Sequence, residues 1–151
     1  MAEALAERLR ALEDREAIRD LIARYGPLAD SGNAEAVAAL FAEDGVYAVG
    51  GMGEARGREA IAALISGPVH RSLMADGCAH VLTSPIIELA GDRATARCYS
   101  IVFRHEEAEW APVRVAANRW ELARAATGQW QVVRRDNALL DGSAAARALL
   151  S

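Results

Sequence analysis

The sequence divides into a helical first half and a strand-rich second half, and this order restricts the folds that the chain can adopt. Apolar residues recur at three- and four-residue steps over residues 5–25, as in an amphipathic helix. From residue 78 onward, β-branched and aromatic residues fill four long segments. Turn residues at 91–92 and 127–128 separate some of these segments. Helices followed by consecutive antiparallel strands predict an α+β fold, in which a strongly curved sheet wraps around helices packed on one face.

Capping and turn residues predict where the elements begin and end. The apolar stripe slips out of phase near Glu13-Asp14, so we expect a short first helix that leads into a longer one. The longer helix is expected to continue past Gly26-Pro27 toward Asp30. The other expected elements are helices over 36–41 and 58–66, strands over 46–49, 79–89, 93–104, 113–122 and 130–137, a flexible turn at 50–53 and a short helix after residue 143.

Length and composition fit a single domain spanning residues 1–151. The chain is 52% hydrophobic and 25% charged, and a chain of this length builds a core without disulfides or a structural metal. Its net charge of −4 and its lack of a basic cluster argue against nucleic acid as a partner. It has no long apolar segment and no apolar leader, so we expect a cytoplasmic protein without a membrane partner.

Several absent motifs remove whole classes of reaction. All 17 basic residues are arginine, which excludes a Schiff-base lysine, a pyridoxal anchor and a P-loop lysine. Cys78 and Cys98 lack the paired spacing of a zinc site and are expected to be reduced. There is no dinucleotide-binding glycine motif, no nucleophile elbow and no histidine pair at metal-ligand spacing. We therefore expect neither a cofactor nor a metal ion.

Strand alternation selects the side chains that would enter the hollow of a curved sheet. Two of the expected faces combine apolar side chains with one imidazole near a strand end. That composition suits a pocket that binds an apolar molecule and transfers a proton at one point. The expected faces are His80, Leu82, Ser84 and Ile86; Tyr99, Ile101, Phe103 and His105; and Ala116, Asn118, Trp120 and Leu122.

An ordered set of residues over about residues 10–140 resembles the SnoaL-like branch of the nuclear transport factor 2 (NTF2) superfamily. The closest similarity in arrangement is to the scytalone dehydratase, hexachlorocyclohexane dehydrochlorinase and bile acid dehydratase families. The residues that carry the resemblance are the segment 15–21 (REAIRDL), Tyr25, Asp30, the segment 40–45 (LFAEDG), His80, the segment 91–94 (GDRA), Asn118 and the segment 128–130 (GQW).

The resemblance implies an NTF2-like cone and a proton-transfer dyad formed by Asp30 and His80. It also implies that His105 and Asn118 correspond to a second histidine and an asparagine of scytalone dehydratase. A serine of that family is replaced by Ala116, and its two tyrosines have only approximate counterparts in Tyr25 and Tyr47. The identity of the substrate therefore cannot be transferred.

The predicted function is a cofactor-independent lyase, either a dehydratase or a related elimination enzyme, or an isomerase. A neutral histidine accepts a proton near neutral pH, and an aspartate bonded to its second nitrogen fixes the tautomer and stabilises the imidazolium. The substrate is expected to be a small apolar cyclic or aromatic molecule. His80 is expected to act as the base and Asp30 as its orienting partner. The groups expected to polarise the substrate or hold the leaving group are Tyr25, His105 and Asn118. The expected substrate-binding residues are Tyr47, Leu82, Phe103 and Trp120.

Each of these residues also has a structural interpretation, and the alternative function is a non-catalytic ligand-binding or assembly module of the same fold. Asp30 fits a turn or helix cap, and His80 fits a satisfied core histidine. His105 and Asn118 are equally compatible with structural roles, and His70 is expected to lie in a surface loop. An open cavity beside a bonded dyad would favour the enzyme, whereas a filled cone would favour the module.

The strand at 93–104 carries apolar residues on both of its faces, at Ile101, Val102 and Phe103. Both faces of such a strand are expected to be covered, which predicts a homo-oligomer. The resemblance favours a trimer over a dimer.

Overall fold

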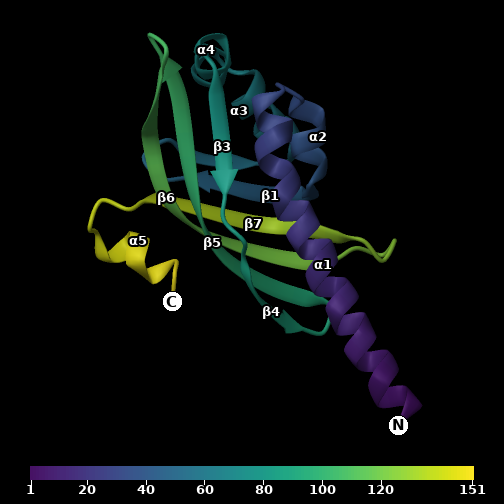
Figure 1. Cartoon of the computed structure of the whole chain (residues 1–151). Helices are drawn as coiled ribbons and strands as arrows, with labels where there is room; N and C mark the ends of the chain where they lie inside the picture. The colour runs from purple at the N-terminus through teal and green to yellow at the C-terminus, as the bar shows by residue number, and fades with distance from the viewer.

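A strongly curved, unclosed sheet forms the body of the protein, and helices pack against its concave face (Figure 1). The computed structural model describes residues 1–151. The strand order is β2-β1-β7-β6-β5-β3, and β4 also pairs with β5. All pairs are antiparallel except β1 with β7. The predicted α+β architecture is thereby confirmed. The strands are β1 (Phe41–Val49), β2 (Gly53–Arg56), β3 (Cys78–Leu82), β4 (Ile86–Ala90), β5 (Arg93–Glu106), β6 (Glu109–Arg124) and β7 (Trp130–Leu139).

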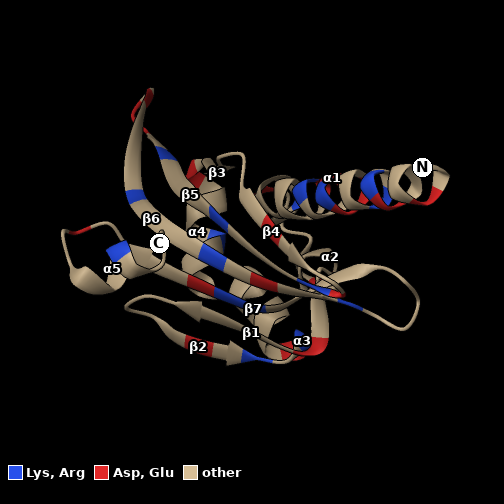
Figure 2. Cartoon of the chain, turned by 90° about the horizontal axis from the view of Figure 1, so that it is seen from below, with Lys and Arg blue, Asp and Glu red and all other residues tan.

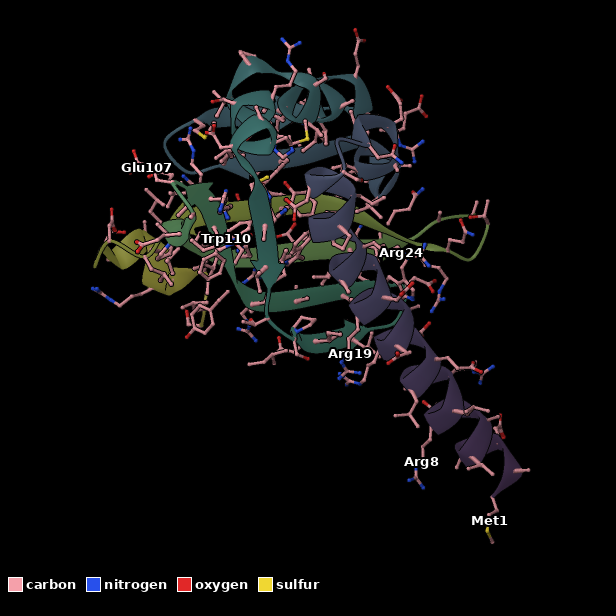
Figure 3. The ribbon with its side chains drawn as sticks, turned by 45° about the horizontal axis from the view of Figure 1, so that its top comes forward. Met1, Arg8, Arg19, Arg24, Glu107 and Trp110 are labelled. Carbon is pink, nitrogen blue, oxygen red and sulfur yellow. The ribbon has the colours of Figure 1, made fainter.

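The first helix, α1, is one continuous element over Ala2–Asp30, so the expected interruption near Glu13-Asp14 is wrong. Asp14 does not cap a helix there. Its carboxylate accepts hydrogen bonds from Trp130 Nε1 at 2.9 Å and Arg124 Nη2 at 2.8 Å, which tie the helix to the β6–β7 hairpin. The N-terminal part of α1 projects past the sheet, and Figure 3 shows Met1 and Arg8 lying clear of the body.

The other helices are short: α2 (Ala34–Ala39), α3 (Arg58–Ser66), α4 (Pro68–Asp76) and α5 (Ala144–Ala148). Asn33 caps α2 by accepting a hydrogen bond from the backbone N–H of Ala36 at 3.2 Å. Pro68 stands in the first turn of α4, where its missing N–H leaves no hydrogen bond unmade. The Gly-Pro pair therefore begins a helix that sequence reasoning did not predict.

Two strand boundaries also differ from expectation. The expected strand over 79–89 is divided into β3 and β4, since Pro85 has no N–H for a ladder hydrogen bond. The expected flexible turn at 50–53 closes a hairpin, with Met52 N–H donating to Val49 O at 2.9 Å, and β2 follows it.

The core lies between α1 and the concave face of the sheet. Ile18, Ile22 and Tyr25 lie on one face of α1 and are almost fully buried. They belong to the same cluster as Trp120 and Val132, which are completely buried. Burial of each such side chain contributes about 1.5–3 kcal/mol relative to an exposed position. This packing fixes the end of α1, and therefore Asp30, against the sheet.

Charged side chains of both signs are interspersed on the surface. Figure 2 shows basic and acidic residues following one another along α1 and across the long strands. No helix is both long enough and apolar enough to cross a lipid bilayer.

Candidate active site

A cavity of about 220 Å³ lies between the concave face of the sheet and helices α3 and α4. Most of its wall is apolar, and the polar side chains are few. Its volume is somewhat below the range of about 300–1,000 Å³ typical of sites for drug-sized ligands. A molecule of one or two rings is the size that such a cavity accommodates. Among the apolar wall residues are Val49, Leu64, Ile65, Val69, Leu73, Leu82 and Val102.

Asp30 and His80 form a bonded pair at the edge of this cavity. Asp30 Oδ1 lies 2.6 Å from His80 Nδ1, and Asp30 Oδ2 accepts a hydrogen bond from the backbone N–H of His80 at 2.8 Å. Asp30 is the last residue of α1, and His80 is the third residue of β3. The aspartate therefore holds both the ring and the backbone of its partner.

The geometry fixes which nitrogen of His80 faces the cavity. Burial opposes the ionisation of Asp30, but the side-chain and backbone hydrogen bonds from His80, the charge of His80 and the Cys78 thiol together lower the pKa of Asp30 below its ordinary value of 3.8. An ionised carboxylate only accepts hydrogen bonds, so Nδ1 carries the proton. Nε2 has no protein partner and can act as a base on a molecule in the cavity.

A second histidine, His70, lines the cavity beside the pair, and the expectation of a surface loop is wrong for it. It lies on α4 and is 6% exposed. Its Nε2 lies 2.6 Å from Ala29 O and must donate, because a carbonyl oxygen only accepts. The ring centroids of His70 and His80 are 5.3 Å apart. Sequence reasoning missed His70 because Pro68 was interpreted as a helix end.

The floor of the cavity contains Arg135, a residue that sequence reasoning also missed. Its side chain is 1% exposed, and its guanidinium carbon lies 4.1 Å, 4.6 Å and 4.2 Å from the ring centroids of Tyr25, Tyr47 and Trp120. Its Nε donates to Asn118 Oδ1 at 2.9 Å, while its Nη1 has no acceptor. No carboxylate neutralises this buried cation.

A β-bulge in the pairing of β6 with β7 explains why the sequence did not predict Arg135 as a cavity residue. In β7 the buried residues Trp130 and Val132 are even-numbered, whereas Arg135 and Asn137 are odd-numbered. The register with β6 shifts by one residue between these two sets, which reverses the face that enters the hollow. No residue in the sequence of β7 marks the bulge, so strand alternation alone does not place Arg135 on the inward face.

Asn118 lies beneath the cavity and is completely buried. Its Nδ2 donates to Ser100 Oγ at 2.7 Å, and its Oδ1 accepts from Arg135 and, at 3.1 Å, from Asn137. It therefore orients Arg135 and does not line the cavity. The hydroxyl that Ala116 lacks comes from Ser100, which pairs with it across β5 and β6 and lines the cavity.

Tyr25, Tyr47 and Leu82 line the cavity as expected, and the two tyrosine hydroxyls are 3.5 Å apart. Burial, together with the neighbouring Tyr47, raises the pKa of Tyr25 well above its ordinary value despite the opposing effect of Arg135. The Tyr25 hydroxyl therefore remains protonated and can donate a hydrogen bond at neutral pH.

Phe103 and His105 do not share the cavity with His80, contrary to expectation. His80 pairs with Val102, and directly paired residues of antiparallel strands project to the same face. The inward residues of β5 are therefore even-numbered. His105 packs instead on Trp110, at 5.2 Å between ring centroids. Figure 3 labels Trp110 and Glu107 at the β5–β6 end of the sheet. Trp120 does not line the cavity either, so its expected role as a substrate-binding residue is wrong. It packs beneath Arg135.

Asp30, Cys78 and His80 are the residues that could hold a metal ion, with ligand atoms within 4.8 Å of one another. The Cys78 thiol donates to Asp30 Oδ1 at 3.5 Å. Burial and the charge and hydrogen bond of Asp30 raise the pKa of Cys78 to about 11. The thiol is therefore protonated at neutral pH in the metal-free site, and a metal ion bound there would have to displace that proton.

Known proteins resemble the chain in sequence and structure. The profile of the SnoaL-like domain family matches residues 10–136. An NTF2-like protein with a cystatin-like fold from Novosphingobium aromaticivorans is 63% identical, over 97% of this chain and 95% of that chain, with a TM-score of 0.95.

Two further solved structures are more distant. A Mycobacterium tuberculosis protein of unknown function is 25% identical, over 91% of this chain and 90% of that chain, with a TM-score of 0.76. A protein from Catenulispora acidiphila, in complex with S-DNPA, is 23% identical, over 90% of this chain and 98% of that chain, with a TM-score of 0.74. No curated protein matches the chain.

Proposed function

The chain belongs to the SnoaL-like domain family, and from this premise we propose that it is a cofactor-independent lyase or isomerase that acts on a small cyclic or aromatic molecule. The observation that carries the proposal is the double hydrogen bond between Asp30 and His80 at the wall of an open cavity. An open cavity beside a bonded dyad favours an enzyme over a non-catalytic module. The complex of the Catenulispora acidiphila protein with S-DNPA supports a small-molecule ligand.

The proposed reaction begins with proton abstraction by His80 Nε2 from a carbon next to an acidifying group. The imidazolium that forms is stabilised by the Asp30 carboxylate. The electron pair of the broken C–H bond forms a carbon–carbon double bond while the bond to a neighbouring leaving group breaks. In an isomerisation, the imidazolium exchanges its N–H proton with solvent and delivers a proton to a different carbon of the substrate.

The negative charge that develops on the substrate or leaving group needs a positive or hydrogen-bonding partner. The Tyr25 and Tyr47 hydroxyls at the cavity wall and the guanidinium of Arg135 behind them supply both. A departing hydroxide takes up the proton held by the His80 imidazolium and leaves as water, whereas a halide leaves as the anion and the imidazolium gives its proton to solvent. Asn118 contributes by holding Arg135 in place through Nε.

The proposal is tested by incubating the purified protein with hydroxylated and halogenated cyclic compounds and measuring mass changes of the small molecules. Loss of water or of hydrogen halide identifies a lyase, and deuterium uptake from heavy water without mass loss identifies an isomerase. The His80→Ala variant is the matched control and should give neither change. Product formation by His80→Ala at the wild-type rate contradicts the proposed base.

A further inference from the structure

The wall of the cavity contains two guanidinium groups and no carboxylate. Arg114 of β6 and Arg135 of β7 are both among the lining residues, and no aspartate or glutamate is. Neither arginine forms an ion pair, although Arg97, Arg104 and Arg124 elsewhere each contact an acidic side chain. Even with the Asp30 carboxylate bonded to His80 at the cavity edge, the two guanidinium groups leave an excess of positive charge.

The charge of Arg114 is offset by fewer contacts with the protein than the charge of Arg135 is. Its Nη2 donates to Gly50 O at 2.9 Å and to Asn137 Oδ1 at 2.7 Å, and both acceptors are uncharged. Its Nε and Nη1 have no protein acceptor. Arg135 faces three aromatic rings, whereas no aromatic ring faces Arg114. Burial is the main cause that lowers the pKa of Arg114 below its ordinary value; the charge interaction with Tyr47 opposes this shift, and the charge of Arg135 adds a smaller lowering effect.

The sheet places Arg114 in line with the dyad. His80 pairs with Val102, and Val102 pairs with Arg114, so the three residues form one row across β3, β5 and β6. Two strand spacings separate the ends of the row, about 10 Å between backbones. A register shift at this point brings both Val113 and Arg114 to the cavity, although neighbouring residues of a regular strand face opposite sides.

We propose that Arg114 binds an anionic group of the substrate, a carboxylate, and that the substrate of the proposed reaction is therefore a small cyclic or aromatic acid. The carboxylate contacts the free nitrogens of Arg114, and the ring packs over Val102. The opposite end of the molecule then lies beside His80 Nε2. Arg114 thus determines specificity for an acid. That this acid is the substrate rests on the proposed function, whereas the binding of a carboxylate by Arg114 does not.

Equilibrium binding of two unreactive probes tests the inference independently of turnover. The probes are 2-naphthoate and 2-naphthamide, which match in shape and differ in charge, and isothermal titration calorimetry at neutral pH measures their affinities. The wild-type protein should bind the acid at least about tenfold more tightly than the amide, as expected for a charge-assisted hydrogen bond. Arg114→Met should remove this preference and leave the affinity for the amide within about twofold, whereas Arg114→Lys should retain part of the preference.

Arg119→Met is the matched control, because Arg119 lies on the same strand with its side chain about one-third exposed. This variant should keep the wild-type preference, and His80→Ala should keep it as well. Thermal melting should confirm that Arg114→Met folds, since the substitution removes a partly buried charge but also leaves Gly50 O and Asn137 Oδ1 without this donor. Equal affinities for the two probes, a preference that survives Arg114→Met, or no binding of the acid at millimolar concentration would overturn the inference. Loss of turnover in a protein that still prefers the acid would count only against the proposed reaction.

Discussion

The carbonyl oxygen of His80 lies directly against the Cα of Gly26, and no Cβ fits between them. Gly26 and Asp30 are four residues apart on α1 and therefore face the same side of the helix. The close approach of helix and strand at Gly26 brings the Asp30 carboxylate within hydrogen-bonding distance of β3. One glycine thus controls the geometry of the dyad.

The variant Gly26→Ala should be less stable than the wild type, because its new methyl group collides with the backbone of β3. Overpacking of this kind costs about 1–3 kcal/mol in the free energy of unfolding. Helix propensity alone predicts the opposite sign, a gain of about 0.5–1 kcal/mol. The sign of the change in unfolding free energy, measured by chemical denaturation, therefore separates overpacking from helix propensity. A more stable Gly26→Ala protein contradicts the contact between Gly26 and His80.

Substitutions in the dyad should affect the rate in a graded way. His80→Ala removes the base and should abolish turnover, whereas Asp30→Asn removes the orienting anion and should lower kcat by about a hundredfold or more. Circular dichroism should confirm that both variants fold, and Asp76→Asn, a change at an exposed acid, serves as the control. Full activity of a folded Asp30→Asn protein would show that Asp30 is structural.

The lowered pKa of Asp30 predicts a specific dependence of stability on pH. The folded protein holds the carboxylate ionised to lower pH than the unfolded chain does, so this stabilisation is present above the ordinary pKa of 3.8. It is lost as the pH falls through the lower pKa of the folded state. The difference in unfolding free energy between wild type and Asp30→Asn should therefore shrink as the pH falls below about 4. A difference that stays constant from pH 6 to about pH 2.5 contradicts the assignment.

Cys78 should react slowly with thiol reagents. Burial and Asp30 raise its pKa to about 11, so the thiolate fraction at pH 8 is about two orders of magnitude below that of an ordinary cysteine. Iodoacetamide labelling in a Cys98→Ala background measures this rate. Asp30→Asn should accelerate labelling without restoring the ordinary rate, because burial is the larger cause. Identical labelling rates of Cys78 with and without the Asp30 carboxylate would count against the hydrogen bond between Cys78 and Asp30.

The outer face of the sheet should be an interface between copies of the chain. Val81, Tyr99 and Val115 are 44%, 48% and 41% exposed and lie on the face opposite the cavity. A patch of this kind is typical of an association surface. We expect a homo-oligomer, with a trimer favoured over a dimer by family resemblance, and dissociation by Val115→Asp. Light scattering that gives a monomer for the wild type at micromolar concentration contradicts this.

The parts of the site that the sequence predicted are those set by local pattern. Asp30 follows a long amphipathic stripe and His80 lies near the start of a strand, so both could be located from the spacing of their elements. Arg135 was missed and His105 was misplaced because inward parity depends on register and on bulges, which are decided by pairing between distant strands. His70 was misplaced because a Gly-Pro pair ends one helix and begins the next equally well.

The parallel pairing of β1 with β7 determines when the cavity is completed during synthesis. Tyr47 and Arg135 are partners in this pairing, although they are 88 positions apart in the chain. A growing chain that ends before residue 130 already contains Asp30 and His80 but leaves one edge of β1 unpaired. Such an edge presents free backbone groups to other chains until the last long strand occupies it. The order of translation thus supplies Arg135, at the basic floor of the cavity, only after both Asp30 and His80 have been synthesised.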